Sequence, residues 1–220
     1  YTIISMVYSP DTIDDFGAYL ALADQLGVDE ARFIPMRLIG GAQESMSAVL
    51  PNQLTAYQKL VDVLDAHPAY ARLLARDYFS ILFSMCRYSR PRTSCGIARN
   101  VAFIDADGAI YPCPNHVGRK FHLGTIKQAS DLDLVLSSSP QLADLRNRYQ
   151  VDCYPRCREC AFGYLCAGDC RGEVLATGGG CHGPSPHCAE LRAVITEMLW
   201  RIADQKELGT NTRRDDTAFQ

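Results

Sequence analysis

Ten cysteines are the residues of this sequence whose type and spacing point most directly to chemistry. None precedes Cys86, and seven of the ten fall between Cys153 and Cys188. The densest stretch, residues 157–170, has the spacing Cys-x2-Cys-x5-Cys-x3-Cys. Two cysteines separated by two residues can bind one metal centre from a single turn, and thiolate is a soft ligand that favours zinc, copper(I) or iron–sulfur. The cysteines therefore predict metal binding.

The number of cysteines exceeds what one centre needs. Four complete one zinc site or one 4Fe–4S cluster, so two multi-iron clusters and two zinc ions are the simple alternatives. Disulfides are a third alternative, but disulfide scaffolds are usually shorter secreted chains with a leader. This sequence has 220 residues and shows no signal peptide. Metal ligation is the favoured interpretation.

The composition is that of an ordinary globular protein, with 47% apolar and 21% charged residues and a formal charge of −3. No positive excess favours nucleic acid or an anionic membrane. No apolar run reaches the roughly 18–20 residues that span a bilayer. The sequence predicts neither a nucleic-acid partner nor a membrane partner.

The elements that position the cysteines begin with a strand–helix–strand pattern. Residues 1–8 are an apolar run, residues 11–27 have apolar side chains at helical spacing, and residues 31–35 are a second short strand. Helices are expected at 53–66 and 70–85. One such unit has too few strands to close a barrel, so the pattern fits the last part of a larger α/β barrel.

Short strands, turns and loops dominate the second half. Residues 101–104 and 109–111, joined by an acidic turn, predict a β-hairpin. Two short helices are expected at 130–136 and 140–149. Residues 152–187 are rich in Cys, Gly and Pro and too poor in aliphatic side chains to build a core. This last segment therefore needs a crosslink, such as a bound metal, to be stable.

The full cysteine order resembles the seven-cysteine signature of SPASM domains, which are C-terminal extensions of radical SAM enzymes. It runs Cys, Gly-x4-Cys, then Cys-x2-Cys-x5-Cys-x3-Cys, and a last Cys, over residues 95–188. The segments IDADGAIYPC, FHLGTI and SPQLADLRNR also fit. The resemblance covers about residues 86–190. Many of these enzymes act on ribosomally made peptides, so the resemblance implies a peptide maturase.

The resemblance implies an α/β region followed by a small α+β domain. Residues 1–85 are expected to be the C-terminal portion of a radical SAM partial (β/α) barrel. Residues 86–190 are expected to be a SPASM domain with a β-hairpin and cysteine-rich loops. A C-terminal amphipathic helix is expected at 191–208 and a flexible tail at 209–220.

The resemblance also implies which cysteines bind which cluster. Auxiliary cluster I is expected to bind Cys86, Cys95, Cys113 and Cys170. Auxiliary cluster II is expected to bind Cys157, Cys160, Cys166 and Cys188. Cys86 lies somewhat farther upstream than the family spacing suggests, and without it cluster I has an iron open to substrate.

Four other residues have open roles. Cys153 and Cys181 are interpreted as unligated thiols; the alternatives are a further ligand, a redox pair or, for Cys181 with His182 and His187, another metal site. Arg32 and Arg37 flank a predicted strand whose C-terminal end would face the active site. Either arginine can bind a carboxylate of AdoMet or substrate, and a surface or structural role is the simpler interpretation.

The sequence departs from the family in two ways. The Cys-x3-Cys-x2-Cys motif that binds the AdoMet-cleaving cluster is absent, so this chain alone is expected to be inactive. Missing residues before Tyr1 are the favoured explanation, and a truncated or partner-dependent form is the alternative. Pro114 follows Cys113, where sulfatase-maturing relatives carry an acidic base, which argues against oxidation to formylglycine. No catalytic residue is assigned.

The implied function is formation of a thioether or carbon–carbon crosslink, or a similar oxidation, in a ribosomally synthesised precursor peptide. Two 4Fe–4S clusters are expected in this chain, with S-adenosylmethionine and a third 4Fe–4S cluster in the intact enzyme. The electron donor is expected to be a flavodoxin or ferredoxin. Oxygen-sensitive clusters and the missing leader imply a cytoplasmic protein. A zinc-stapled protein-interaction module and an iron–sulfur electron-transfer adaptor are the alternatives.

Overall fold

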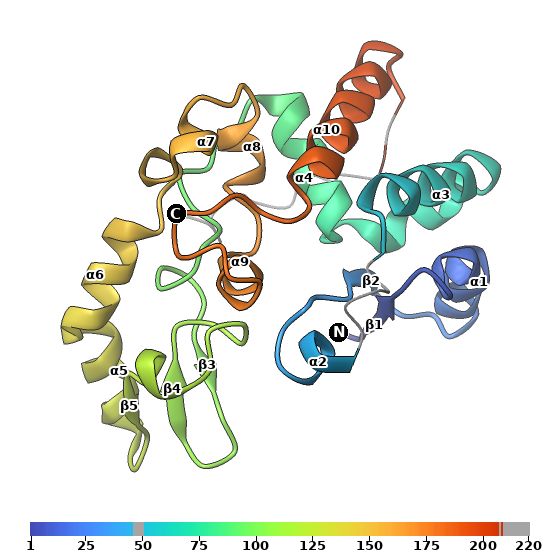
Figure 1. Cartoon of the computed structure of the whole chain (residues 1–220). Coiled ribbons are helices and arrows are strands. Elements are labelled where there is room, and N and C mark those ends of the chain that lie inside the picture. Colours follow the sequence, from blue (N-terminus) through green and yellow to red (C-terminus); the bar gives the residue numbers. More distant parts are fainter. Residues whose placement is uncertain (46–50, 207, 209–220) are drawn as a thin grey trace. The chain divides into compact units, whose positions relative to one another are not determined.

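The computed structural model describes residues 1–45, 51–206 and 208 (Figure 1). The predicted tail at 209–220 lies outside the described residues. The chain divides into two compact units. Unit 1 comprises 1–38, 44–91 and the part from 187 onward, and unit 2 comprises 39–43 and 92–186.

Unit 1 begins with the predicted strand–helix–strand. Strands β1 (Ile3–Tyr8) and β2 (Glu30–Pro35) pair in parallel from Ile3 opposite Glu30 to Tyr8 opposite Pro35. Helix α1 (Phe16–Gln25) buries Phe16, whose ring lies 4.1 Å from that of Phe33 on β2. The helix is followed by Gly27 at φ +63°, a left-handed position that favours glycine. The predicted βαβ pattern is confirmed.

Two further helices of unit 1 follow. Helix α3 (Gln53–Ala66) has the predicted bounds. It begins at Gln53 because the Asn52 side chain caps it by accepting hydrogen bonds from the backbone N–H groups of Leu54 and Thr55. The prediction of one helix over 70–85 is wrong. The chain instead forms a 3-10 helix, Pro68–Leu74, and then α4 (Tyr78–Tyr88).

Asp77 separates these two elements. Its buried carboxylate accepts hydrogen bonds from the N–H of Phe79 at 3.0 Å, which caps α4, and from the N–H of Phe33 at 2.8 Å. Burial raises the pKa of Asp77 to about 6, against the effect of these hydrogen bonds. The contact ties α4 to strand β2.

The C-terminal helix α10 (Cys188–Ala203) packs against α3 and α4 within unit 1. It begins three residues before the predicted start and buries Leu191, Val194, Ile195 and Met198. Arg201 pairs with Asp65 of α3 at 2.6 Å. The helix is therefore part of the same packed unit as the first half of the chain, rather than a separate segment.

Unit 2 contains an antiparallel sheet in the order β3 (Phe103–Ile104), β4 (Ala109–Tyr111), β5 (Gly124–Thr125). The first two strands form the predicted hairpin, with a shorter first strand, and Gly108 takes φ +83° in the turn. The third strand was not predicted, because two residues carry no alternating pattern.

Helices and one apolar core complete unit 2. The helices are α5 (Ala129–Ser138), α6 (Pro140–Arg148), α7 (Pro155–Arg158), α8 (Gly163–Cys166) and α9 (Arg171–Ala176). Helix α2 (Gly41–Ser45) lies earlier in the chain and is divided between the two units. The buried core is Ile97, Ala98, Leu142, Leu145, Tyr149, Val151, Tyr154, Cys157 and Ala167. The two helices predicted near 130–136 and 140–149 are confirmed. The cysteine-rich segment adds few aliphatic side chains to this core.

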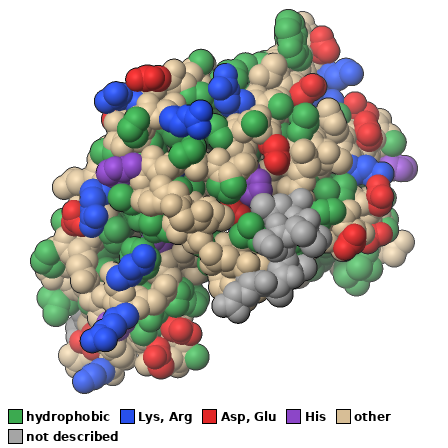
Figure 2. Space-filling view, in the orientation of Figure 1, with side chains coloured by type: hydrophobic (Ala, Val, Ile, Leu, Met, Phe, Trp, Pro, Cys, Tyr) green, Lys and Arg blue, Asp and Glu red, His purple; other side chains and the backbone are tan. Residues whose placement is uncertain are grey.

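No helix within the described ranges is long and apolar enough to cross a membrane. On the face drawn in Figure 2, positive and negative side chains are both present and neither sign covers the face. This mixture agrees with the small formal charge of −3.

Candidate metal centre

Three cysteines of unit 2 form what we call the inner triad: Cys95, Cys113 and Cys170. They come from the loop before Ile97, the segment after β4 and the residue that precedes α9. Burial raises the pKa of the Cys113 thiol to about 12, and the charges of Cys170 and Cys95 raise it further. The three sulfurs therefore lie close enough to influence one another's ionisation.

Several N–H groups point at the sulfurs of the inner triad. The Asn115 side-chain amide lies 3.2 Å from the Cys170 sulfur, and the backbone N–H groups of Asn115 and His116 favour the Cys113 thiolate. The Ile97 N–H does the same for Cys95. Hydrogen bonds to thiolate sulfur are a feature that tunes iron–sulfur clusters.

His116 links this triad to Tyr149. Its Nδ1 lies 3.2 Å from the Cys113 sulfur and its Nε2 lies 3.1 Å from the Tyr149 hydroxyl. Burial lowers the pKa of His116 to about 4, so the ring is neutral near pH 7 and carries one N–H. A cluster-bound thiolate only accepts, so with Cys113 bound to a cluster Nδ1 would donate to Cys113 and Nε2 would accept from Tyr149. Sequence reasoning missed His116, although the pattern Cys-x2-His was visible.

The outer triad consists of Cys157 on α7, Cys160 in the following loop and Cys166 at the end of α8. Burial raises the pKa of the Cys166 thiol to about 11. The charges of Cys157 and Cys160 raise it further, whereas a hydrogen bond from the Gly168 N–H opposes them. The dense sequence motif thus places the sulfurs of Cys157 and Cys160 within electrostatic reach of Cys166.

Each triad includes a close backbone approach that only glycine allows. A Cβ on Gly163 would lie 2.2 Å from the carbonyl oxygen of Cys157. A Cβ on Gly172, the second residue of α9, would lie 2.3 Å from the carbonyl oxygen of Asn115. The loops that carry the ligands are therefore packed backbone to backbone.

Gly172→Ala is expected to destabilise the protein, because α9 and the Asn115 loop must move apart. We expect the free energy of unfolding to fall by about 1–3 kcal/mol, measured by anaerobic chemical denaturation. The control is Gly17→Ala, at the second residue of α1, where a Cβ meets only Val63 at 3.7 Å. It should leave stability unchanged or raise it by about 0.5–1 kcal/mol. Equal destabilisation of both variants would contradict the packing argument.

The donor set fits an iron–sulfur group. Both triads offer soft thiolates with N–H donors, and the inner triad lies beside buried Arg171, whose Nε has no hydrogen-bond partner in the described part of the chain. Within that same part, no three His, Cys, Asp or Glu side chains gather closely enough to hold a single metal ion. A multi-iron cluster takes one thiolate at each iron, so its ligands need not converge on one point.

The remaining predicted ligands lie in unit 1. Cys86 is buried in the last turn of α4, and Cys188 is the first residue of α10. Their assignment to clusters I and II stays a prediction. All ten cysteines, which lie within the described ranges, are free of disulfides.

The two leftover thiols have different surroundings. Cys153 is exposed, and its sulfur lies 3.3 Å from the carbonyl oxygen of Asn147. Cys181 is partly buried against the core of unit 2 and raises the pKa of Tyr149, which burial already elevates. His187, suggested as a metal partner for Cys181, pairs with Glu190 at 3.6 Å in unit 1.

Arg32 lies on strand β2, and Arg37 follows the end of that strand. The Arg32 Nε donates to the Glu30 carboxylate at 2.8 Å, and Glu30 is buried. Arg37 lowers the pKa of Tyr8, which burial raises strongly. Arg32 thus has a structural partner, and substrate or AdoMet binding by either arginine stays a prediction.

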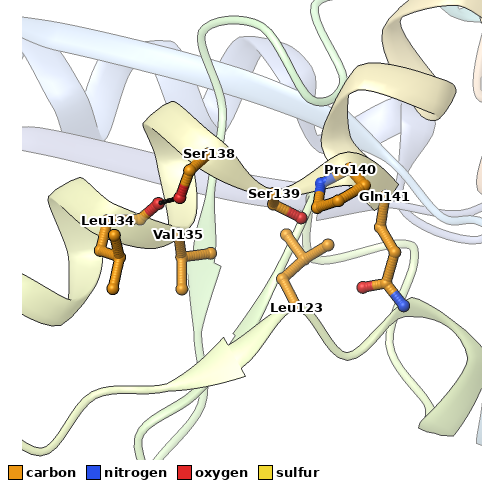
Figure 3. A pocket seen from close by; sticks show the side chains of 7 residues that line it. All are labelled: Leu123, Leu134, Val135, Ser138, Ser139, Pro140 and Gln141. Atoms are coloured by element: carbon orange, nitrogen blue, oxygen red, sulfur yellow. Dashed lines mark hydrogen bonds between the residues drawn. The ribbon is translucent and has the colours of Figure 1, made fainter.

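A groove of about 440 Å³ lies elsewhere in unit 2 (Figure 3). It is lined by Leu123, Leu134, Val135, Ser138, Ser139, Pro140 and Gln141. The Ser138 hydroxyl donates to the Leu134 carbonyl rather than into the groove. The lining contains none of the predicted site residues.

Residues 95–161 match the SPASM family, described as an iron–sulfur cluster-binding domain. This part of the chain is a SPASM domain. The match includes Cys95, Cys113, Cys157 and Cys160 and stops before Cys166. The predicted resemblance to radical SAM enzymes with a SPASM domain is confirmed.

The relatives agree with this identification. The mycofactocin maturase MftC of Mycobacterium ulcerans is 27% identical over 192 residues, covering 85% of this chain and 49% of the relative. MftC of Mycolicibacterium smegmatis is 27% identical over 195 residues, covering 85% of this chain and 46% of the relative. The chain thus spans about half the length of these curated relatives.

A solved structure shares the fold. Native anSMEcpe with bound AdoMet and Cp18Cys peptide aligns with a TM-score of 0.64 at 17% identity, covering 92% of this chain and 58% of the other. Its fold supports the mixed α/β architecture around the SPASM domain.

Proposed function

We propose that the SPASM domain is the site of two 4Fe–4S clusters. Auxiliary cluster I would be held by the inner triad with Cys86, and auxiliary cluster II by the outer triad with Cys188. The observation that carries the proposal is that six thiols of unit 2 fall into two groups, in which Cys95 and Cys170 act on Cys113, and Cys157 and Cys160 act on Cys166. When bound, such clusters supply one-electron transfer.

The reaction proposed for the intact enzyme is formation of a thioether or carbon–carbon crosslink in a ribosomally made peptide. AdoMet cleavage would provide a radical that abstracts a hydrogen atom from the peptide. Closing a thioether from the resulting carbon radical and a thiol releases one proton and one electron. The chain's own part is to hold the acceptor of that electron in a protected, hydrogen-bonded setting.

The partners follow from this reaction. They are a precursor peptide, AdoMet with a third cluster, and an electron donor such as a flavodoxin or ferredoxin. MftC is named as a maturase, and anSMEcpe was solved with AdoMet and a peptide. The partial barrel assigned to residues 1–85 belongs to the same proposal, supported by the parallel β1–β2 pair with α1 packed on it. A cytoplasmic location would suit oxygen-labile clusters.

Metal analysis tests the proposal. The 220-residue chain, isolated without oxygen, is expected to hold iron and acid-labile sulfide in equal amounts, about eight of each. Stoichiometric zinc without sulfide would replace the proposal with a zinc-stapled interaction module. The enzyme part is tested by the coding sequence upstream of Tyr1, where a Cys-x3-Cys-x2-Cys motif supports it and its absence favours an electron-transfer adaptor.

A further inference from the structure

Arg171 is a buried cation beside the inner triad. It directly follows Cys170 and is 1% exposed. Its Nη1 donates to the Gly168 carbonyl at 3.0 Å and its Nη2 to the Gly183 carbonyl. The guanidinium carbon lies 4.2 Å from the centre of the Tyr154 ring. These contacts fix the charge in place.

Arg92 is a second cation near the same triad. It lies three residues before Cys95, and its Nη2 donates to the Leu165 carbonyl at 3.0 Å, next to Cys166 of the outer triad. Its backbone N–H donates to the Tyr164 carbonyl at 2.7 Å. Arg92 is thus anchored beside the outer triad while its charge acts on Cys95.

Neither guanidinium has a carboxylate partner in the described part of the chain, and in both the Nε is buried without a hydrogen-bond partner there. A buried charge without a counter-charge is costly. Both arginines act on Cys95 and favour its ionised form, so their charges lie within electrostatic reach of the inner triad. Two cations, each with an unused Nε–H donor, therefore act on a group of thiols that would carry negative charge as cluster ligands.

We propose that Arg171, with a smaller contribution from Arg92, is the counter-charge of the inner cluster and raises its reduction potential above that of the outer one. The inference rests on the proposed function. A fixed positive charge stabilises the more negative reduced cluster, so reduction becomes easier. Arg171 is a positioning residue in this sense, since it acts through the electrostatics of the centre.

The test is a redox titration of the anaerobically isolated protein followed by electron paramagnetic resonance. Arg171→Gln should lower the reduced-to-oxidised ratio of the inner cluster about tenfold at a fixed potential. For a one-electron couple, this corresponds to a reduction potential that is lower by about 59 mV. Arg171→Lys keeps the charge and should restore most of the shift. Arg92→Gln should lower the reduced-to-oxidised ratio of the same cluster about threefold.

The matched control is Arg158→Gln, between Cys157 and Cys160 of the outer triad. Its side chain is 59% exposed and its charge is solvated, so the reduction potentials of both clusters should stay unchanged. Unchanged potentials in Arg171→Gln with full iron would overturn the inference. If Arg171→Gln fails to bind iron, the Arg92→Gln variant becomes the deciding test. An unchanged reduction potential of the inner cluster in Arg92→Gln would then overturn the inference. Absence of iron and sulfide from the unsubstituted protein would instead refute the proposed function.

Discussion

Cys113→Ala is expected to remove about half of the iron and acid-labile sulfide from the protein. Cys113 interacts with both other members of the inner triad and receives N–H donors from Asn115 and His116, so no neighbouring thiol can replace it. Loss of one of two clusters halves the metal content, whereas loss of a ligand from a single shared site would remove all of it. Iron and sulfide analysis with electron paramagnetic resonance measures the outcome.

The matched control for this variant is Cys153→Ala. Cys153 is exposed, and its sulfur donates a hydrogen bond to the Asn147 carbonyl at 3.3 Å. The control should keep all of its iron and both spectroscopic signals. If Cys113→Ala kept full iron, or if Cys153→Ala lost as much, the assignment of the inner triad would be wrong.

Removal of iron is expected to unfold the cysteine-rich segment and to spare helix α3 of unit 1, which carries none of the proposed ligands. Helices α7 and α8 have four residues each and α9 has six, and none can be stable without tertiary support. Helix α3 has 14 residues and buries Leu60 and Leu64 in unit 1. Ligand binding therefore supplies folding free energy to the first group and not to the second.

Hydrogen–deuterium exchange measures this difference in the protein before and after treatment with an iron chelator. Amide protection in α7, α8 and α9 should fall by about a hundredfold or more, corresponding to roughly 3 kcal/mol of local stability. Protection in α3 serves as the internal reference and should change little. Full protection of α7–α9 in iron-free protein would mean that the core of unit 2 holds these helices by itself.

The first half of the fold was predictable wherever the signal is local. Helix α3 was placed to the residue because its apolar side chains recur at helical spacing within one short segment. The break at Asp77 was missed because its carboxylate bonds to Phe33, which is distant in sequence. Strand β5 was missed because its two residues, Gly124 and Thr125, pair with β4 through the backbone alone.

The candidate site shows the same division. The cysteines were found because thiolate chemistry and spacing are visible in the sequence. His116, Arg92 and Arg171 were not found, because a histidine or arginine is informative only once the structure shows that it acts on a sulfur. Burial and hydrogen bonding are properties of the folded chain, so sequence spacing supplied the ligands and the structure supplied their surroundings.

The wide separation of Cys95, Cys113 and Cys170 along the chain has a consequence for biosynthesis. A growing polypeptide holds only two of these thiols until the ribosome has passed the last one, so metal delivery must follow synthesis of the whole region. Damage by air would return the region to that immature condition, exposing short segments to proteases. In the proposed function, loss of the clusters and loss of folded structure in this region are therefore coupled.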